Sequence, residues 1–433
     1  MSNSLKPESE EKLPRTLGMW GIWLLVVNGL IGAGIFGLPS GAAALAGEYS
    51  IFIYLFCASL ILSVIFCFAE LASYFRGTGG PIRYATTAFN PFMGFQAGWL
   101  FYIARVVSFS ANSVLLVDSI GYFFPSLATG SYRLVLLALI CGLLTLVNVL
   151  GAVGSIRSLA GVTFVKFFVL ILLVLTGIFL YGGKIIPSFN SPLPEINDLG
   201  KAALLLIYAF VGFEGGVVNA GEAKNPVRDM PRALLLGIGM VTILYILIQA
   251  VSMAVVPDIA STTTPLLDVA NGLMGSAGAV ILMIGVVASV GGNLIAAIFS
   301  TPRLTYALAN DGHLPGWFGR VHPKFLTPAN SIIFYGVLSF VLAAFGSFIW
   351  LAASTVLSRL FLYIISIASI PKLRKTRSTP ESFKLPFGYL LPAIAILACV
   401  WLMFQVSFDS ILATIGYVGL GTGLYLVRRY SAE

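Results

Sequence analysis

The chain has 433 residues, of which 58% are hydrophobic and only 10% are charged, and its mean hydropathy is +0.96. Water-soluble domains carry about 25% charged residues, so the composition excludes a soluble globular protein and indicates an all-α polytopic membrane protein in a lipid bilayer. The formal net charge of +8 follows from the placement of the basic residues described below, and we expect no nucleic-acid partner.

A helix needs about 20 apolar residues to cross the hydrocarbon core of a bilayer. With turn residues and charges as boundaries, the sequence predicts twelve transmembrane segments, of which the ninth and tenth are separated only at Gly346–Ser347. Their ranges are 18–44, 49–75, 91–123, 132–154, 159–182, 200–221, 232–256, 276–308, 329–347, 349–371, 387–406 and 409–427.

The basic residues set the expected orientation. With the N-terminus inside, 19 of the 25 Lys and Arg residues lie in cytoplasmic segments, and only Arg133, Lys184 and Lys201 lie in outer loops. This asymmetry fits the positive-inside rule. It predicts a cell-membrane protein with a cytoplasmic N-terminal tail, residues 1–15, and a cytoplasmic C-terminus.

Two predicted segments carry helix breakers at mid-depth. The first contains "GLIGAGIFGLP" (29–39) and the sixth contains "YAFVGFEGG" (208–216). Each Gly costs a helix interior about 1 kcal/mol relative to Ala, and a Pro costs about 3 kcal/mol. Paired interruptions in the two halves of an inverted repeat point to a transporter's binding site, because freed backbone groups are tolerated at that depth only around a polar cavity.

The freed backbone groups favour a solute with both charges. A half-helix that begins near Gly34 presents its N–H groups to a carboxylate, whereas carbonyls around Leu30, Ile31 and Tyr208–Val211 can accept hydrogen bonds from an ammonium group. The alternative interpretation is that these glycines form small-residue packing faces between helices.

Several motifs in order resemble the amino acid–polyamine–organocation (APC) superfamily of transporters over nearly the whole chain. They are "IGAGIFGLP", "AELASYFRGTGGPIRYATTAF" (69–89), "AFVGFEG", "GEAKNPVRDMPRA" (221–233) and "YALANDGHLPGWFGRVHPKFLTPAN" (306–330). The resemblance implies a five-plus-five inverted repeat (LeuT-like) with broken helices one and six. Residues 16–182 would form the first repeat, 183–371 the second, and 372–433 two further helices with a short cytoplasmic end.

The resemblance also implies the substrate site. The substrate carboxylate would lie against the first break, at Ile31, Gly32, Ala33, Gly34 and Ile35, beside Leu30. The amino group would meet carbonyls of the sixth segment, at Tyr208, Ala209 and Val211, with Phe210, Phe213 and Glu214 capping the solute. Asn293 in the eighth segment is a candidate contact for the substrate side chain, with an interhelical hydrogen bond as the alternative.

Lys166 lies nine residues beyond Arg157, about 13 Å along a helix, which is too deep for easy snorkelling. Burial favours the uncharged amine, so Lys166 is a candidate for binding and releasing a proton. The resemblance implies that it replaces a sodium ion, reaching carbonyls near Gly29–Leu30 and also Ser289. A static structural lysine is the alternative.

Three other charges lie within predicted segments. Glu214 is a candidate for gating or protonation, or else a structural hydrogen-bond partner. Arg105 and Arg359 either face the solute, where they would favour an acidic side chain, or pair inside the bundle.

Taken together, the sequence predicts a secondary active transporter of a small amino acid, proton-coupled and sodium-independent, that works by alternating access. Obligatory amino acid exchange is the alternative, and a polyamine or organic cation permease has less support because no acidic cluster accompanies Glu214. The chain lacks GxSxG and HExxH motifs, so we expect no enzyme. Its four cysteines show no metal-ligand spacing, and we expect no metal or cofactor.

Overall fold

The computed structural model describes residues 18–75, 80–151, 159–214, 224, 226–377 and 382–430. Within these ranges the regular elements are all helical, with no strand. Eight helices are long and apolar enough to cross a membrane, and three shorter helices are also apolar. The chain is therefore a multi-pass membrane protein, while its division into twelve segments stays a prediction. The predicted tail, residues 1–15, lies outside the described ranges.

The helices follow one another in chain order with short connections. They are α1 (Met19–Leu30), α2 (Ala33–Ala46), α3 (Ser50–Ser73), α4 (Gly80–Ala88), α5 (Pro91–Phe123), α6 (Gly130–Val149), α7 (Leu159–Tyr181), α8 (Ile196–Phe210), α10 (Pro226–Val255), α11 (Pro265–Val286), a π-helical turn (Val287–Gly291), α12 (Gly292–Ser300), α13 (Pro302–Asn310), α14 (Ala329–Phe345), α15 (Phe348–Ala368), α16 (Ile370–Thr376), α17 (Leu390–Met403) and α18 (Phe408–Tyr430).

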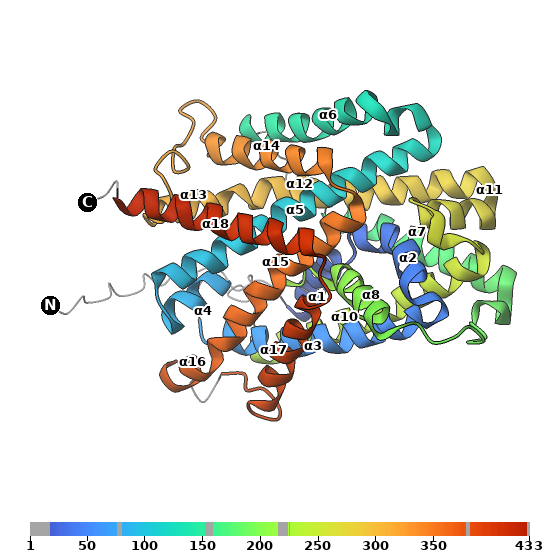
Figure 1. Ribbon diagram of the computed structural model, residues 1–433, viewed down its shortest axis with the longest axis horizontal. Helices are drawn as coiled ribbons and strands as arrows, with labels where there is room; N and C mark the ends of the chain where they lie inside the picture. Colours follow the sequence, from blue (N-terminus) through green and yellow to red (C-terminus); the bar gives the residue numbers. More distant parts are fainter. Residues whose placement is uncertain are drawn as a thin grey trace.

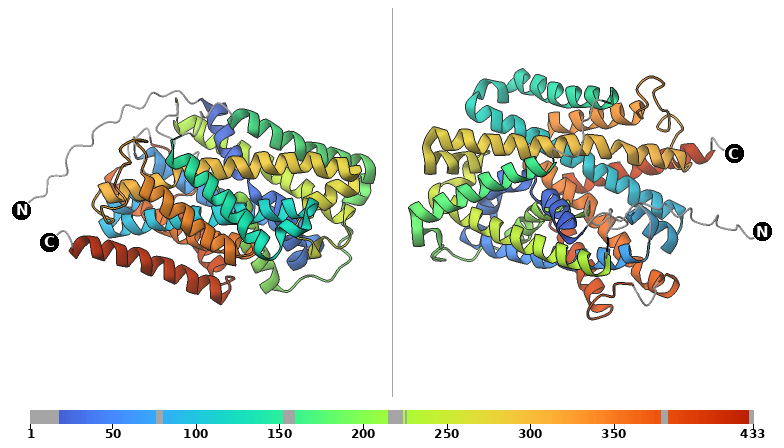
Figure 2. Two further views of the ribbon diagram at one scale, coloured as in Figure 1. Left: turned by 90° about the horizontal axis from the view of Figure 1, so that it is seen from above. Right: turned by 180° about the vertical axis from the view of Figure 1, so that it is seen from behind.

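Most long helices run along the long axis of the molecule, and α5 crosses its middle (Figure 1). Helices α6 and α14 lie side by side along one edge, and the two further views place α18 at the periphery (Figure 2). Large apolar side chains such as Phe179 and Phe345 point outward, as expected for a surface that contacts lipid. The buried core lies between α1, α2, α3, α5, α8, α10 and α15.

Several predicted boundaries agree with the structure, and one is wrong. The third segment matches α5, and the division at Gly346–Ser347 is confirmed because α14 ends at Phe345 and α15 begins at Phe348. The eighth segment was expected to begin at 276, yet α11 begins at Pro265. The helix continues through a kink at Gly275, whose φ is 65°, and such a glycine resembles a turn in the sequence.

The first membrane segment is interrupted as the sequence predicts. Helix α1 ends at Leu30 and α2 begins at Ala33, because Ile31 and Gly32 leave the helical region with ψ values of 88° and −147°. Pro39, in contrast, lies inside α2 without ending it, and the Gln249 amide donates to its carbonyl at 3.2 Å. The break therefore depends on the glycine-rich stretch rather than on the proline.

The sixth segment is interrupted at the corresponding place. Helix α8 ends at Phe210, Val211 is extended, and Gly212 has a φ of 113°. A positive φ of this size is open almost only to glycine. The chain is described as far as Glu214 and again from 224, with 215–223 outside the described residues.

The two breaks meet backbone to backbone. A Cβ atom added to Gly29 would overlap the carbonyl of Gly212, and one added to Gly212 would overlap the carbonyl of Gly29. Similarly, a Cβ at Gly34 would lie 3.0 Å from the Cα of Ala209. Glycine is thus required here for close approach of α1 and α2 to α8.

We predict that Gly29→Ala lowers the melting temperature of the purified protein in detergent. In an open helix Gly→Ala stabilises by about 1 kcal/mol, but here the new methyl group overlaps backbone that must shift, at a typical cost of about 1–3 kcal/mol. Gly239→Ala in α10 is the matched control, because its added Cβ meets nothing within 4 Å. Its melting temperature should be unchanged or higher. A Gly29→Ala protein that melts at or above the wild type contradicts the prediction.

Candidate functional site

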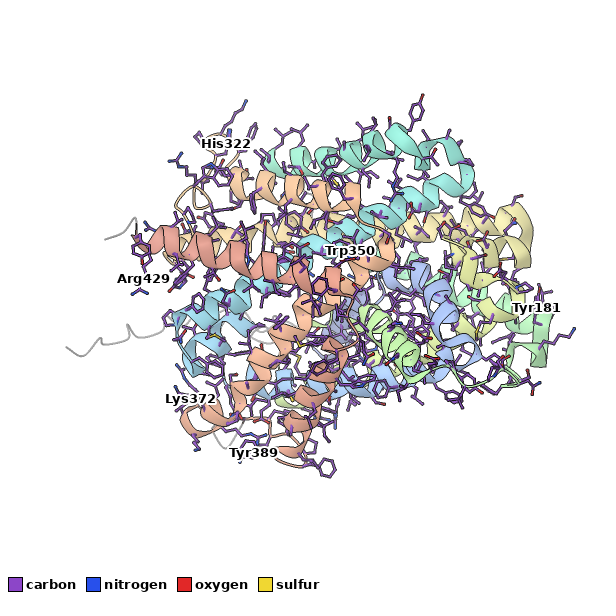
Figure 3. The ribbon with its side chains drawn as sticks, viewed as in Figure 1. Tyr181, His322, Trp350, Lys372, Tyr389 and Arg429 are labelled. Atoms are coloured by element: carbon purple, nitrogen blue, oxygen red, sulfur yellow. The ribbon has the colours of Figure 1, made fainter. Side chains whose placement is uncertain are left out.

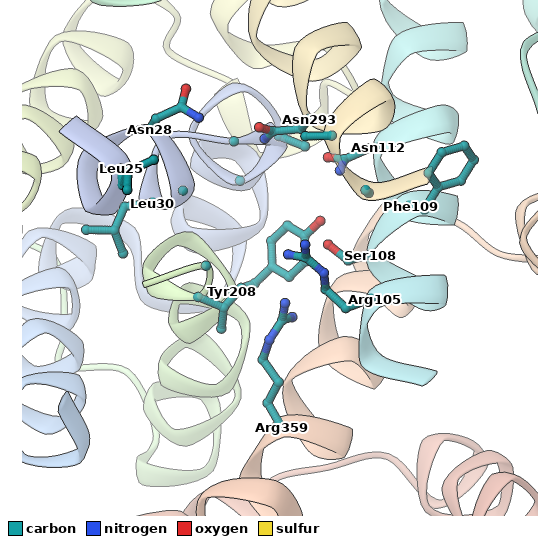
Figure 4. A pocket seen from close by; sticks show the side chains of 18 residues that line it. Leu25, Asn28, Leu30, Arg105, Ser108, Phe109, Asn112, Tyr208, Asn293 and Arg359 are labelled. Atoms are coloured by element: carbon teal, nitrogen blue, oxygen red, sulfur yellow. The ribbon is translucent and has the colours of Figure 1, made fainter. Parts of the chain in front are cut away.

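A cavity of about 240 Å³ lies where the two breaks meet. It is enclosed by residues of α1, α2, α5, α8, α12 and α15, and by the interruptions themselves (Figure 4). Polar side chains and exposed backbone make up much of its wall, among them Asn28, Arg105, Ser108, Asn112 and Asn293. The cavity is below the roughly 300 Å³ at which drug-sized ligand sites begin, so it suits one small solute.

One wall of the cavity is the N-terminus of α2. Ala33 and Gly34, in the first turn, line it, and no side chain caps this helix end at Gly32. The first N–H groups of a helix have no partner within the helix, and together with the helix dipole they attract an anion.

The opposite wall is one face of α5. Arg105, Ser108, Phe109 and Asn112 line the cavity, and their spacing of three, four and seven residues places them on one side of a helix. The Asn112 side chain is 6% exposed, and its Oδ1 has no hydrogen-bond partner among the described residues. The sequence analysis missed Ser108 and Asn112, although this polar stripe on an apolar helix was visible.

The cavity is open at one end and closed at the other. Ala296 and Ser300 of α12, at the end toward α13, are exposed. Along α2, the cavity ends where Phe348 and Leu115 press against Gly37, so that a Cβ there would lie 3.0 Å from the Leu115 Cδ1.

Lys166 of α7 holds the first break from behind. Its side chain is 0% exposed, and Nζ donates to the carbonyls of Asn28 at 2.9 Å and Ile31 at 2.7 Å. The hydroxyl of Ser289, in the π-helical turn, donates to the same Ile31 carbonyl at 3.3 Å. The carbonyls expected as partners, near Gly29–Leu30, are instead the two that flank that pair.

Tyr245 of α10 joins the two breaks. Its hydroxyl lies 2.8 Å from the carbonyl oxygen of Leu30 and 3.2 Å from that of Ala209. Two of the carbonyls that the sequence analysis assigned to the substrate are therefore within reach of a protein donor. Nothing in the sequence marks Tyr245 for this role, because it is an ordinary aromatic residue in an apolar helix.

Glu214 and Arg359 form a buried ion pair beside the second break. Both side chains are 2% exposed, and the Arg359 Nε donates to the Glu214 carboxylate at 3.1 Å. That carboxylate also accepts from the Tyr363 hydroxyl at 2.5 Å and from the Gly212 N–H at 2.7 Å. Glu214 thus fixes the turn at Gly212 to α15.

The predicted substrate residues fall into two groups. The structure brings seven of them to the cavity: Leu30, Gly32, Ala33, Gly34, Tyr208, Val211 and Asn293. The other four, Ile31, Ile35, Ala209 and Phe210, are outside its lining. Ile35 and Phe210 are fully buried on other faces of their helices, Phe210 against Tyr54 and Tyr245.

The residues predicted for coupling and gating surround the cavity without lining it. Lys166 and Ser289 lie behind the first break, and Glu214 lies behind the second. Phe213 is buried against the rings of Phe68 and Tyr363.

Comparison with known proteins assigns the chain to a family. A sequence model of the amino acid permease family matches residues 17–422. The chain belongs to this family. It is 26% identical to the methylthioribose transporter of Bacillus subtilis over 99% of this chain and 97% of that protein. It is 27% identical to the branched-chain amino acid permease BcaP of the same organism over 98% and 95%, and 25% identical to the arginine/agmatine antiporter of Chlamydia pneumoniae over 96% and 91%.

These relatives are named as transporters, and none of the three names denotes an enzyme. The resemblance to the APC superfamily is thereby confirmed, and membership of the amino acid permease family supports amino acid transport.

In this family member, we predict that Tyr245→Phe destabilises the join between the breaks. The change removes one hydroxyl and leaves two buried carbonyls with one donor fewer, at an expected cost of about 1–3 kcal/mol. Thermal unfolding in detergent measures it. Tyr49→Phe is the control, since the Tyr49 hydroxyl donates to an exposed carbonyl, that of Ser191, at 3.0 Å. Equal melting temperatures for the two variants would refute the assignment.

We also predict that Glu214→Gln destabilises the protein strongly. It leaves the Arg359 charge buried without its counter-charge, which typically costs about 3–5 kcal/mol. Asp198→Asn is the comparison, because it breaks an exposed pair with Lys201 and should cost less than about 1 kcal/mol. Unfolding in increasing denaturant distinguishes the two variants, and a Glu214→Gln protein as stable as Asp198→Asn would show that the buried pair is unimportant.

Proposed function

We propose that the chain is a secondary active transporter that moves a small amino acid across the cell membrane by alternating access. The proposal includes the twelve-segment, five-plus-five inverted repeat with helices one and six broken. The observation that carries it is the meeting of two interrupted helices, at Ile31–Gly32 and Val211–Gly212, around one polar cavity. A plain packing face between continuous helices would leave neither break nor cavity.

The cavity offers a place for each charge of a zwitterion. The uncapped N–H groups of Ala33 and Gly34 suit the α-carboxylate. For the α-ammonium group, the carbonyls of Tyr208 and Val211 at the cavity wall are candidates, because those of Leu30, Ile31 and Ala209 are already close to protein donors. Asn293, whose amide lies against Gly32, would contact the remainder of the substrate.

Alternating access is supported by a cavity that reaches only one end of the bundle. Lys372 and Arg429 lie at the same end, and Tyr181 lies at the opposite end (Figure 3). With the basic end cytoplasmic, as the positive-inside rule expects, both termini are cytoplasmic and the structure is the inward-open state. Gly37 and Phe348 then form part of the closed outer gate.

Lys166 supports a sodium-independent mechanism coupled to protons. Its amine occupies the space between the α1 carbonyls and Ser289 where a cation would otherwise be bound. A neutral amine has two N–H donors, and Lys166 makes two hydrogen bonds, so it can lose a proton and keep both contacts. Obligatory exchange remains the alternative function, since one relative is named an antiporter.

We predict that purified protein in liposomes accumulates an amino acid when an inward proton gradient is imposed, without sodium. In Lys166→Ala this gradient-driven accumulation should fall at least tenfold, while exchange of internal for external amino acid persists. Radiolabelled uptake measures both. Thr176→Ala on the same helix is the control, because its hydroxyl contacts only the Met274 sulfur at 3.9 Å. Accumulation in Lys166→Ala equal to the wild type would refute coupling through this residue, and exchange without any accumulation in the wild type would favour the exchanger.

A further inference from the structure

Two guanidinium groups point into the cavity, one from α5 and one from α15 (Figure 4). Arg105 donates from one Nη to the Ser300 hydroxyl at 3.2 Å. Arg359 uses Nε for Glu214, and its Nη1 is buried with no hydrogen-bond partner among the described residues. Both arginines therefore retain donors directed at the cavity.

The charges around the cavity do not cancel. Arg105 and Arg359 are positive, and Glu214 is the carboxylate that faces them. Glu214 is already paired with Arg359. Lys166 adds no compensation because it points to the α1 carbonyls behind the break. One positive charge is thus left over, and a buried charge without a partner is costly.

A neutral zwitterion leaves this excess unchanged, because its two charges cancel. A second carboxylate corrects it and also supplies acceptors for the idle N–H groups. Arg–carboxylate hydrogen bonds are short, directional and about twice as strong as those between neutral groups. The two guanidinium groups lie across the cavity from α1, at a distance from the α2 N-terminus that leaves each carboxylate its own site.

We propose that the substrate is an amino acid with an acidic side chain, whose second carboxylate is bound by Arg105 and Arg359. This assignment rests on the proposed function, since it concerns the same cavity. Aspartate and glutamate have the required chemistry, and the volume of about 240 Å³ restricts the cavity to one molecule of that size. Ser108 and Asn112, beside Arg105 on α5, complete a polar wall for the side chain.

The test compares acids with their amides, which have the same shape and lack the charge. Purified protein is reconstituted in liposomes with the membrane potential clamped at zero, and each amino acid competes with uptake of a labelled one. We expect aspartate or glutamate to compete at least ten times better than asparagine or glutamine. In Arg105→Gln this preference should fall at least tenfold, and Arg105→Lys should retain part of it.

Arg303→Gln is the matched control. Arg303 lies outside the cavity lining, with its guanidinium over the Phe299 ring at 3.8 Å, so the acid preference should be that of the wild type. Because the first comparison uses wild-type protein, the proposal can be tested even if a variant fails to fold.

The possible results separate this inference from the function on which it rests. Transport in which the amides compete as well as or better than the acids overturns the acidic substrate and leaves amino acid transport intact. So does an acid preference that Arg105→Gln leaves unchanged, because the arginine is then not its source. If no amino acid of any class is transported or bound, the proposed function fails and this inference fails with it.

Discussion

The structure depends on satisfying the backbone groups that the two breaks release in a membrane interior. Without water, an unpaired carbonyl there costs several kcal/mol. Lys166 and Ser289 serve the Ile31 carbonyl, and Tyr245 lies within reach of those of Leu30 and Ala209. These donors come from α7, the π-helical turn and α10, so the breaks determine which helices must surround them. Stability and site geometry therefore have one physical origin.

The second constraint is electrostatic. The Glu214–Arg359 pair is desolvated but well supported, since the carboxylate also accepts from Tyr363 and from the backbone at Gly212. Such a pair contributes more to geometry than to net stability. It holds the turn at the second break against α15 while presenting the other side of Arg359 to the cavity. One residue thus belongs both to the scaffold and to the cavity wall.

Sequence reasoning located the features that depend on local chemistry. Glycines at 29–37 marked the first break, the depth of Lys166 marked it as a residue that must find acceptors, and the bounds of α5 were read correctly from Pro91 to Phe123. It failed where the outcome depends on distant segments. Tyr245 is far from both breaks in the chain, and no local pattern predicts its role.

Helix rotation and backbone freedom explain the remaining differences. Once α2 begins at Ala33, Ile35 faces away from the cavity that Ala33 and Gly34 line, and only the starting residue of the helix decides this. The start of α11 was missed because Gly275 permits a kink within a continuous helix as readily as a loop. The polar face of α5, in contrast, was readable from spacing and was overlooked.

The contact between Gly29 and Gly212 has a mechanical consequence. Two bare backbones touch without interlocking side chains, so one helix can pivot on the other without rotamer changes or the opening of a void. Interdigitated side chains elsewhere in the core must separate before their helices can tilt. The crossing point is thus a low-friction bearing at the centre of a tightly packed bundle.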